Sequence, residues 1–119
     1  MGNDQKFRLY EDGDLNAIAR QSKMKCVALL FAADWLGSSY ILERFLEEEG
    51  YAHPEISLYK VYIDKNPSLT KKMDIRQLPA IYFFVDGEIV SFLEGLASRK
   101  KVREKFAQAI GARTENKKP

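Results

Sequence analysis

Apolar residues along this chain occur either in continuous runs, which are typical of buried strands, or in one-sided stripes, which are typical of amphipathic helices. Residues 26–33 are almost entirely apolar, as expected for a central strand that is buried on both faces. Residues 56–63 are rich in β-branched and aromatic side chains and are expected to form another long strand. Between them, an apolar stripe predicts a helix that ends at Gly50. That stripe consists of Ile41, Leu42, Phe45 and Leu46.

The remaining elements are shorter and are marked by turn residues. Residues 7–10 are expected to form a first strand, and the turn chemistry of residues 12–14 precedes a helix. Asn66 is expected to cap a third helix, with Pro67 at its first position, and the pair at residues 74–75 closes it. The first helix is indicated by the spacing of Leu15, Ile18 and Ala19.

A hairpin and a last helix complete the chain. Asp86-Gly87 between residues 80–85 and 88–94 is a strong hairpin signal. Ser98 can cap a helix that Gly111 stops. The order is therefore β-α-β-α-β-α-β-β-α, which predicts an α/β fold with a mixed five-stranded sheet and helices on both faces. We expect one domain over residues 1–111 and a flexible tail over 112–119.

Composition narrows the function classes. The net charge of +2 is too small to indicate nucleic-acid binding, and no apolar segment approaches the roughly 20 residues that span a bilayer. The first residues lack the apolar core of a signal peptide. The single cysteine, Cys26, excludes an intramolecular disulfide. A cytoplasmic protein without a membrane or nucleic-acid partner is the simplest expectation.

Four short segments resemble the thioredoxin family in order and spacing. The turn after the central strand reads Ala33-Asp34-Trp35-Leu36-Gly37-Ser38-Ser39, which is similar to the Trp-Cys-Gly-Pro-Cys segment of that family. Residues 60–67 resemble its third strand and following turn, residues 74–80 resemble its cis-proline segment, and residues 85–88 with 94–95 fall at its hairpin and later glycine. The resemblance covers residues 7 to 110 and implies the thioredoxin fold.

The resemblance also shows which chemistry is missing. Leu36 and Ser39 stand at the positions of the two cysteines, so neither the low-pKa thiolate nor the resolving thiol is present. Leu30 stands where the family commonly has a buried aspartate, which leaves Lys60 without that partner. We therefore expect no thiol–disulfide oxidoreductase activity and no cofactor. Leu36, Ser39 and Leu30 are degenerate active-site positions.

Other reactive side chains have simpler interpretations. Cys26 opens a buried strand, where a lone cysteine is most often a small hydrophobe, although a reactive thiol remains the alternative. Ser38 and Ser39 start a helix, so capping is favoured over nucleophilic catalysis. His53 stands alone in a loop, without the ligands of a metal site. Lys60 is expected to reach the sheet edge or to pair with a nearby aspartate, Asp34 or Asp64, with ligand contact as the alternative.

The family's substrate groove keeps its outline in this chain. The resemblance implies that an extended peptide would pair with the backbone of Leu78, which the following Pro79, if cis, turns outward. Leu36 makes such a groove more apolar than a cysteine would. The alternative is that these residues persist because the fold needs them, with Trp35 packed on the sheet and Pro79 fixing a turn. The predicted binding residues are Trp35, Leu36, Gly37, Ser38, Ser39, Gln77, Leu78, Pro79 and Gly95.

Three functions follow as expectations. The leading one is a redox-inactive thioredoxin-like module that binds a protein or peptide, as a chaperone-like protein or as a subunit of an assembly. The second is an enzyme of another kind that acts through Cys26. The third is a homodimer in which a second copy covers the groove, so the chain is expected to be a monomer or a weak homodimer.

Overall fold

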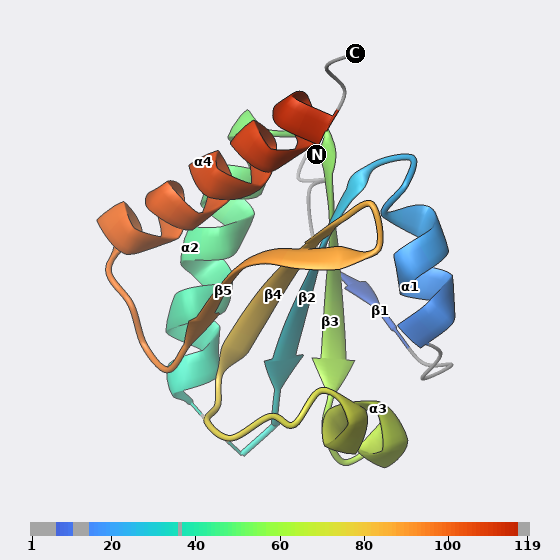
Figure 1. Ribbon diagram of the computed structural model, residues 1–119. Helices are drawn as coiled ribbons and strands as arrows, with labels where there is room; N and C mark the ends of the chain where they lie inside the picture. Colours follow the sequence, from blue (N-terminus) through green and yellow to red (C-terminus); the bar gives the residue numbers. More distant parts are fainter. Residues whose placement is uncertain (1–6, 11–14, 36, 117–119) are drawn as a thin grey trace.

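The computed structural model describes residues 7–10, 15–35 and 37–116. Its elements follow the predicted order, and Figure 1 shows their arrangement. The elements are β1 (Arg8–Leu9), α1 (Leu15–Gln21), β2 (Cys26–Ala32), α2 (Ser38–Ala52), β3 (Ile56–Tyr62), α3 (Pro67–Lys72), β4 (Ala80–Val85), β5 (Glu88–Glu94) and α4 (Arg99–Asn116).

One mixed sheet of five strands organises the molecule, in the order β1-β3-β2-β4-β5. Strands β1, β3 and β2 run parallel, whereas β4 pairs antiparallel with both β2 and β5. This is the thioredoxin fold that the sequence predicts. The connections through α1 and α2 join parallel strands, whereas the chain reverses direction between β3 and β4, and β4–β5 is an antiparallel hairpin. No helix among the described residues is long and apolar enough to cross a membrane.

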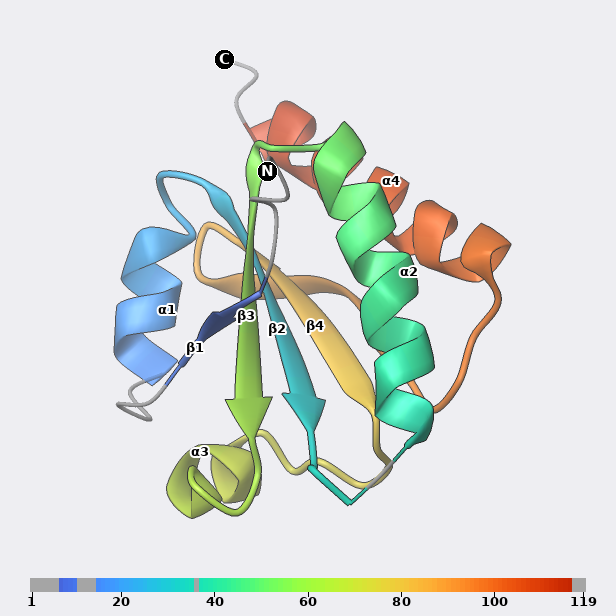
Figure 2. The ribbon, with the colours of Figure 1, turned by 180° about the vertical axis from the view of Figure 1, so that it is seen from behind.

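Helices cover both faces of this sheet, with α2 and α4 on one face and α1 and α3 on the other (Figures 1 and 2). All seven residues of β2 are buried. Their side chains alternate, because successive residues of a strand point to opposite faces. Ala28 and Leu30 join the core under α2 and α4, whereas Val27, Leu29 and Phe31 join the core under α1 and α3. The continuous apolar run of β2 is thus explained by two cores that share one strand.

The pairing register of β2 brings three loops to one end of the sheet. Phe31 near the end of β2 lies opposite Ala80 at the start of β4, and Ala80 lies opposite Glu94 at the end of β5. On the other side, Ala32 lies beside Tyr62 at the end of β3. The segments that follow β2 and β3, precede β4 and follow β5 are therefore neighbours, and α3 lies at this same end (Figures 1 and 2).

The β4–β5 turn confirms the hairpin signal. Asp86 and Gly87 both have positive φ, 53° and 84°, as the two central residues of a type I′ turn require. The turn is also tied to the end of α1, because Ser22 accepts hydrogen bonds from both turn amides. Its carbonyl oxygen lies 2.9 Å from the nitrogen of Asp86, and its hydroxyl oxygen lies 2.7 Å from that of Gly87. These hydrogen bonds thus fix the β4–β5 turn to the end of α1.

The predicted end of the last helix is wrong. Helix α4 continues through Gly111 to Asn116, so most of the expected tail is helical. Glycine costs about 1 kcal/mol in a helix interior, but contacts beyond it offset that cost. The guanidinium of Arg113 donates to the carbonyl of Met24 at 2.6 Å, and the hydroxyl of Thr114 donates to the carbonyl of Ile110 at 3.0 Å. Residues 117–119 lie outside the described part of the chain.

Smaller differences concern the other element ends. Helix α2 continues past the buried Gly50 to Ala52, and β1 has only the two residues that pair with β3. Asn66 occupies the cap position of α3, as predicted, but its side chain makes no capping hydrogen bond. Its amide nitrogen instead donates to the carbonyl of Tyr62 at 3.1 Å. The turn predicted at residues 12–14 lies outside the described residues.

Candidate functional site

Trp35 follows β2 and is exposed to solvent. Its exposed fraction of 69% shows that the indole is not packed on the sheet, so that part of the scaffold interpretation is wrong. An indole buries a large apolar area when it is covered, and tryptophan is enriched at interfaces. Leu36, the next predicted binding residue, lies outside the described residues. Of these two apolar residues of the predicted groove, only Trp35 can therefore be placed.

The loop before β4 supplies the second part of the site. The peptide bond between Leu78 and Pro79 is cis, Leu78 is half-buried and Pro79 is buried. The carbonyl oxygen of Pro79 accepts a hydrogen bond from the nitrogen of Gly95 at 2.7 Å, which ties this loop to the end of β5. The predicted residues Leu78, Pro79 and Gly95 are therefore brought together.

The backbone conformation of Gly95 favours glycine, and the end of the Gln77 side chain lies close to it. Its φ of 81° lies in the left-handed region, and a Cβ added there would lie 2.7 Å from the amide nitrogen of Gln77. Gln77, itself exposed, thus extends over the backbone of Gly95. Gln77, Leu78, Pro79 and Gly95, the four predicted residues of the two loops, are therefore neighbours, with Gln77 exposed and Pro79 and Gly95 buried.

The start of α2 differs from the prediction. The helix begins at Ser38, and the cap position belongs to Gly37, which makes no side-chain capping bond. Ser38 and Ser39 are therefore the first two helical residues, so neither occupies the cap position that the sequence predicted for them. Glycine is an accepted cap residue because it imposes little conformational restriction there.

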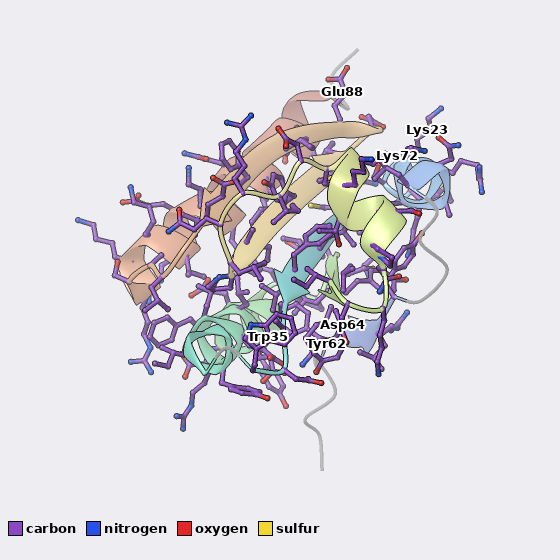
Figure 3. All side chains as sticks on the ribbon, turned by 90° about the horizontal axis from the view of Figure 1, so that it is seen from below. Lys23, Trp35, Tyr62, Asp64, Lys72 and Glu88 are labelled. Atoms are coloured by element: carbon purple, nitrogen blue, oxygen red, sulfur yellow. The ribbon has the colours of Figure 1, made fainter. Side chains whose placement is uncertain are left out.

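A pocket of about 430 Å³ opens beside Trp35, between the end of β3 and α3. This size lies within the range of small-ligand sites, which are mostly apolar with a few polar groups. Figure 3 views this end of the molecule and shows Trp35 and Asp64 between α2 and α3. The apolar lining consists of Trp35, Ile63, Pro67 and Ile75, and the polar lining of Asp64, Thr70, Lys71 and Asp74.

Beneath the site, a different ion pair stands near the position of the missing acid. Leu30 is fully buried and lies directly beside Lys60 in the β2–β3 ladder, as the resemblance implies. The ammonium of Lys60 pairs with the carboxylate of Glu43 on α2 at 2.7 Å, and both side chains are mostly buried. The expected partners Asp34 and Asp64 are wrong. Lys60 has kept a carboxylate partner, but that carboxylate comes from α2 instead of β2.

The surroundings of Lys60 keep it charged. Burial by itself would lower its pKa, but hydrogen bonding to Glu43 and to Tyr62 outweighs burial, and the net shift is upward. The ammonium also lies 5.2 Å from the centre of the Tyr62 ring, within the range of a cation–π interaction. Leu30 therefore borders a charged pair without contributing to it.

Cys26 lies at the opposite end of β2 from Trp35 and is 1% exposed. Burial raises the pKa of its thiol to about 12, although the nearby Arg113 acts in the opposite direction and Glu55 adds to the rise. A reactive thiol needs a depressed pKa and access to solvent. Cys26 has neither property, which favours the inert interpretation.

The sequence suggested that His53 stands alone in a loop. In the structure it follows the last residue of α2 and lies between two carboxylates. Its ring nitrogens lie 3.7 Å from Glu49 and 3.7 Å from Glu55, and its ring packs near Phe106 with 6.0 Å between the ring centres. Among the described residues, no group of three or more His, Cys, Asp or Glu side chains could hold a metal ion. These contacts assign His53 to the packing of α2 against α4.

Comparison with known proteins agrees with this geometry. The family model described as Thioredoxin matches residues 9–108, which is most of the chain. The chain belongs to the thioredoxin family. Thioredoxin-1 of Caenorhabditis elegans is 27% identical over 103 residues, which cover 87% of this chain and 89% of that protein. Thioredoxin of Buchnera aphidicola is 33% identical over 95 residues, which cover 78% and 85% of the two chains.

Solved structures agree as well. The X-ray structure of Fasciola hepatica thioredoxin superposes with a TM-score of 0.77 at 25% identity, over 87% of this chain and 99% of that one. Within this thioredoxin-family chain, one cysteine argues against dithiol chemistry, because two thiols are needed to form a disulfide within the protein.

Two features of the site were missed by sequence reasoning. Glu43 was not expected to pair with Lys60, because helical periodicity alone cannot show that a carboxylate faces a lysine on a strand. One signal was available in the sequence. Glu43 lies four residues after Ser39, one helical turn beyond the degenerate motif, and could therefore have been expected near it. The pocket under α3 was missed because its lining comes from three separate segments.

Replacement of Glu43 by alanine is expected to destabilise the fold by about 1–3 kcal/mol, because it leaves a mostly buried ammonium without its partner. Glu48→Ala is the matched control, since the exposed pair of Glu48 with Arg99 is expected to contribute less than about 1 kcal/mol. Urea unfolding measures both. In the double variant with Lys60→Met, much of the stability should return; a double variant as unstable as Glu43→Ala would contradict the ion-pair explanation.

Alkylation of Cys26 by iodoacetamide is expected to be very slow in the folded protein at pH 8 and fast in urea. The thiol is buried, and its pKa of about 12 keeps it protonated. Since the ordinary value of 9.0 applies after unfolding, the stability due to this group is present below about pH 9 and is lost as the pH rises toward 12. Mass spectrometry follows the reaction. Labelling of the native protein at the rate of the unfolded protein would overturn the inert assignment.

Proposed function

We propose that this thioredoxin-family protein is inactive in thiol–disulfide exchange and binds an extended segment of a protein or peptide. The binding surface would be the groove formed by Trp35, Gly37, the segment 77–79 and Gly95. The observation that carries the proposal is the exposed indole of Trp35, 69% accessible beside an open pocket. A large apolar side chain at a point where several loops meet commonly marks a contact site.

The absence of redox activity is inferred from the residues at the former active-site turn. Disulfide reduction requires a thiolate to attack sulfur and a second thiol to release the mixed disulfide. Leu36 carries no heteroatom, and a serine hydroxyl at position 39 cannot take part in sulfur exchange. Cys26 cannot replace them, because it lies buried at the far end of β2. The burial of Cys26 also disfavours a non-dithiol enzyme acting through it.

Peptide binding would use the main chain of the loop before β4. In the family, an extended segment pairs with the backbone of the residue before the cis-proline, which is Leu78 here. That loop is held by the Gly95–Pro79 hydrogen bond, so its backbone is already ordered before a partner arrives. An ordered site loses less conformational entropy on binding, which favours affinity. The partner would be a protein or peptide, including a second copy of this chain, in the cytoplasm.

Insulin reduction with dithiothreitol tests the redox part of the proposal. The protein is expected to show no turnover above the background of dithiothreitol alone, because it lacks both thiols of the turn. The variant Leu36→Cys/Ser39→Cys is the positive control and is expected to accelerate insulin precipitation. Turnover by the unmodified chain would overturn redox inactivity, whatever the variant does.

Binding to an unfolded protein tests the groove. Reduced, carboxymethylated α-lactalbumin, which stays extended and offers no thiols, is immobilised and the protein is passed over it. Trp35→Ala is expected to weaken binding at least about five-fold, since truncation of a large interface aromatic commonly costs more than 1 kcal/mol. Leu36→Asp, which adds a charge at the position between Trp35 and Gly37 in the sequence, should weaken it as well.

The control for this experiment is Met24→Ala. Met24 is 79% exposed but lies before β2, at the opposite end of the sheet from Trp35. Its removal should leave binding unchanged. Equal binding by the unmodified protein, Trp35→Ala and Leu36→Asp would show that the groove is not the contact surface.

A further inference from the structure

The polar side chains that line the pocket beside Trp35 mostly accept hydrogen bonds. Asp64 and Asp74 offer carboxylates. Thr70 donates its hydroxyl to the carbonyl of Asn66 at 2.8 Å, so that only the lone pairs of its oxygen remain for a ligand. The donors of the lining are the ammonium of Lys71 and the indole N–H of Trp35. Such a set suits a group that is rich in donors and has no acceptor.

Charge around the pocket is distributed unevenly. Asp74 is already paired, since its carboxylate accepts from Nε of Arg76 at 3.2 Å and from Nη2 at 3.0 Å. Asp64 makes no ion pair or hydrogen bond through its side chain with the described residues. Of the two consecutive lysines of α3, Lys71 lines the pocket, whereas Lys72 lies on the side of α3 away from Trp35 (Figure 3). The unpaired charges of the lining are thus one carboxylate and one ammonium.

The exposed indole decides between a cationic and an anionic ligand. The face of a tryptophan ring is negative and attracts a cation, most favourably a planar guanidinium that can stack on it. Trp35 and Asp64 follow the neighbouring ends of β2 and β3 and line the same pocket, where Figure 3 shows them close together. A guanidinium stacked on the indole would therefore have a free carboxylate beside it.

We propose that this pocket, lined by Trp35, Asp64, Thr70 and Ile75, binds the guanidinium of an arginine side chain of the segment held in the groove. The inference rests on the proposed function, because the arginine belongs to the bound partner. Ile63, Pro67 and Ile75 pack against the methylene part of the side chain, while the carboxylate of Asp64 and the oxygen of Thr70 accept from its N–H groups. The protein thus selects partners with an arginine near the residue that pairs with Leu78.

The test uses a single amino-acid probe that is too short to pair along the groove. Isotope-labelled protein is titrated with N-acetyl-arginine methylamide, with the uncharged citrulline analogue and with N-acetyl-glutamate methylamide. Trp35 is the single tryptophan, so its indole N–H resonance reports on this pocket without ambiguity. The arginine probe is expected to shift that resonance and the amides of Asp64 and Thr70, with roughly five-fold higher affinity than the citrulline probe.

Two exposed positions provide matched variants that leave the fold intact. Asp64→Asn is expected to lower the affinity for the arginine probe toward that for the citrulline probe, because the carboxylate is lost while the indole face remains. Lys71→Gln is expected to raise it, because the like charge is removed. Equal affinity for the arginine and citrulline probes, tighter binding of the glutamate probe, or weaker arginine binding in Lys71→Gln would each overturn the proposal.

These outcomes are separate from those of the groove experiment. If unfolded α-lactalbumin binds through Trp35 but the arginine probe shows no preference, the groove stands and the arginine pocket is wrong. If the probe binds as expected but no extended chain binds, the pocket is a guanidinium site and the proposed function is wrong.

Discussion

The pairing of β2 on both of its edges is the constraint on which the rest of this molecule depends. Every residue of the strand is buried, and its two neighbours, parallel β3 and antiparallel β4, fix where each of its ends lies. A shift of one residue would exchange the side chains of the two cores, because alternate residues face opposite layers. The register therefore determines which side chains form each of the two cores. It also determines that the loops of the site are neighbours at the carboxyl end of β2.

Strand β2 also separates Cys26, the single thiol, from Trp35, which stands at the former active-site turn. Cys26 begins β2 under α4, where burial keeps the thiol protonated, and Trp35 follows its other end in solvent. Leu30 lies between them and faces the same layer as Glu43 and Lys60. The position that would carry an acid in the family is apolar, yet a lysine and a carboxylate still meet beside it. The layer is thus closely packed and its buried lysine is paired, without an acid at position 30.

Most of the fold could be predicted from the sequence because its elements have strong local signals. The apolar run of β2, the Asp86-Gly87 turn and the Asn66-Pro67 start each act through neighbouring residues, and the structure has all three. The end of α4 was mispredicted because a local signal, Gly111, competes with distant contacts of Arg113 and Met24. The partner of Lys60 was mispredicted for the same reason, since Glu43 reaches it from another layer.

The sequence by itself determined that the chain has a single cysteine, which argues against dithiol chemistry, because a missing thiol needs no coordinates to be recognised. It also determined the order of elements and the positions of Trp35, Pro79 and Gly95 along the chain. Only the tertiary structure decided that Trp35 is exposed and that Asp64, Thr70 and Ile75 share a pocket with it. The physical reason is that exposure and pocket lining depend on three-dimensional neighbours from separate elements, which no local pattern of hydrophobic and polar residues encodes.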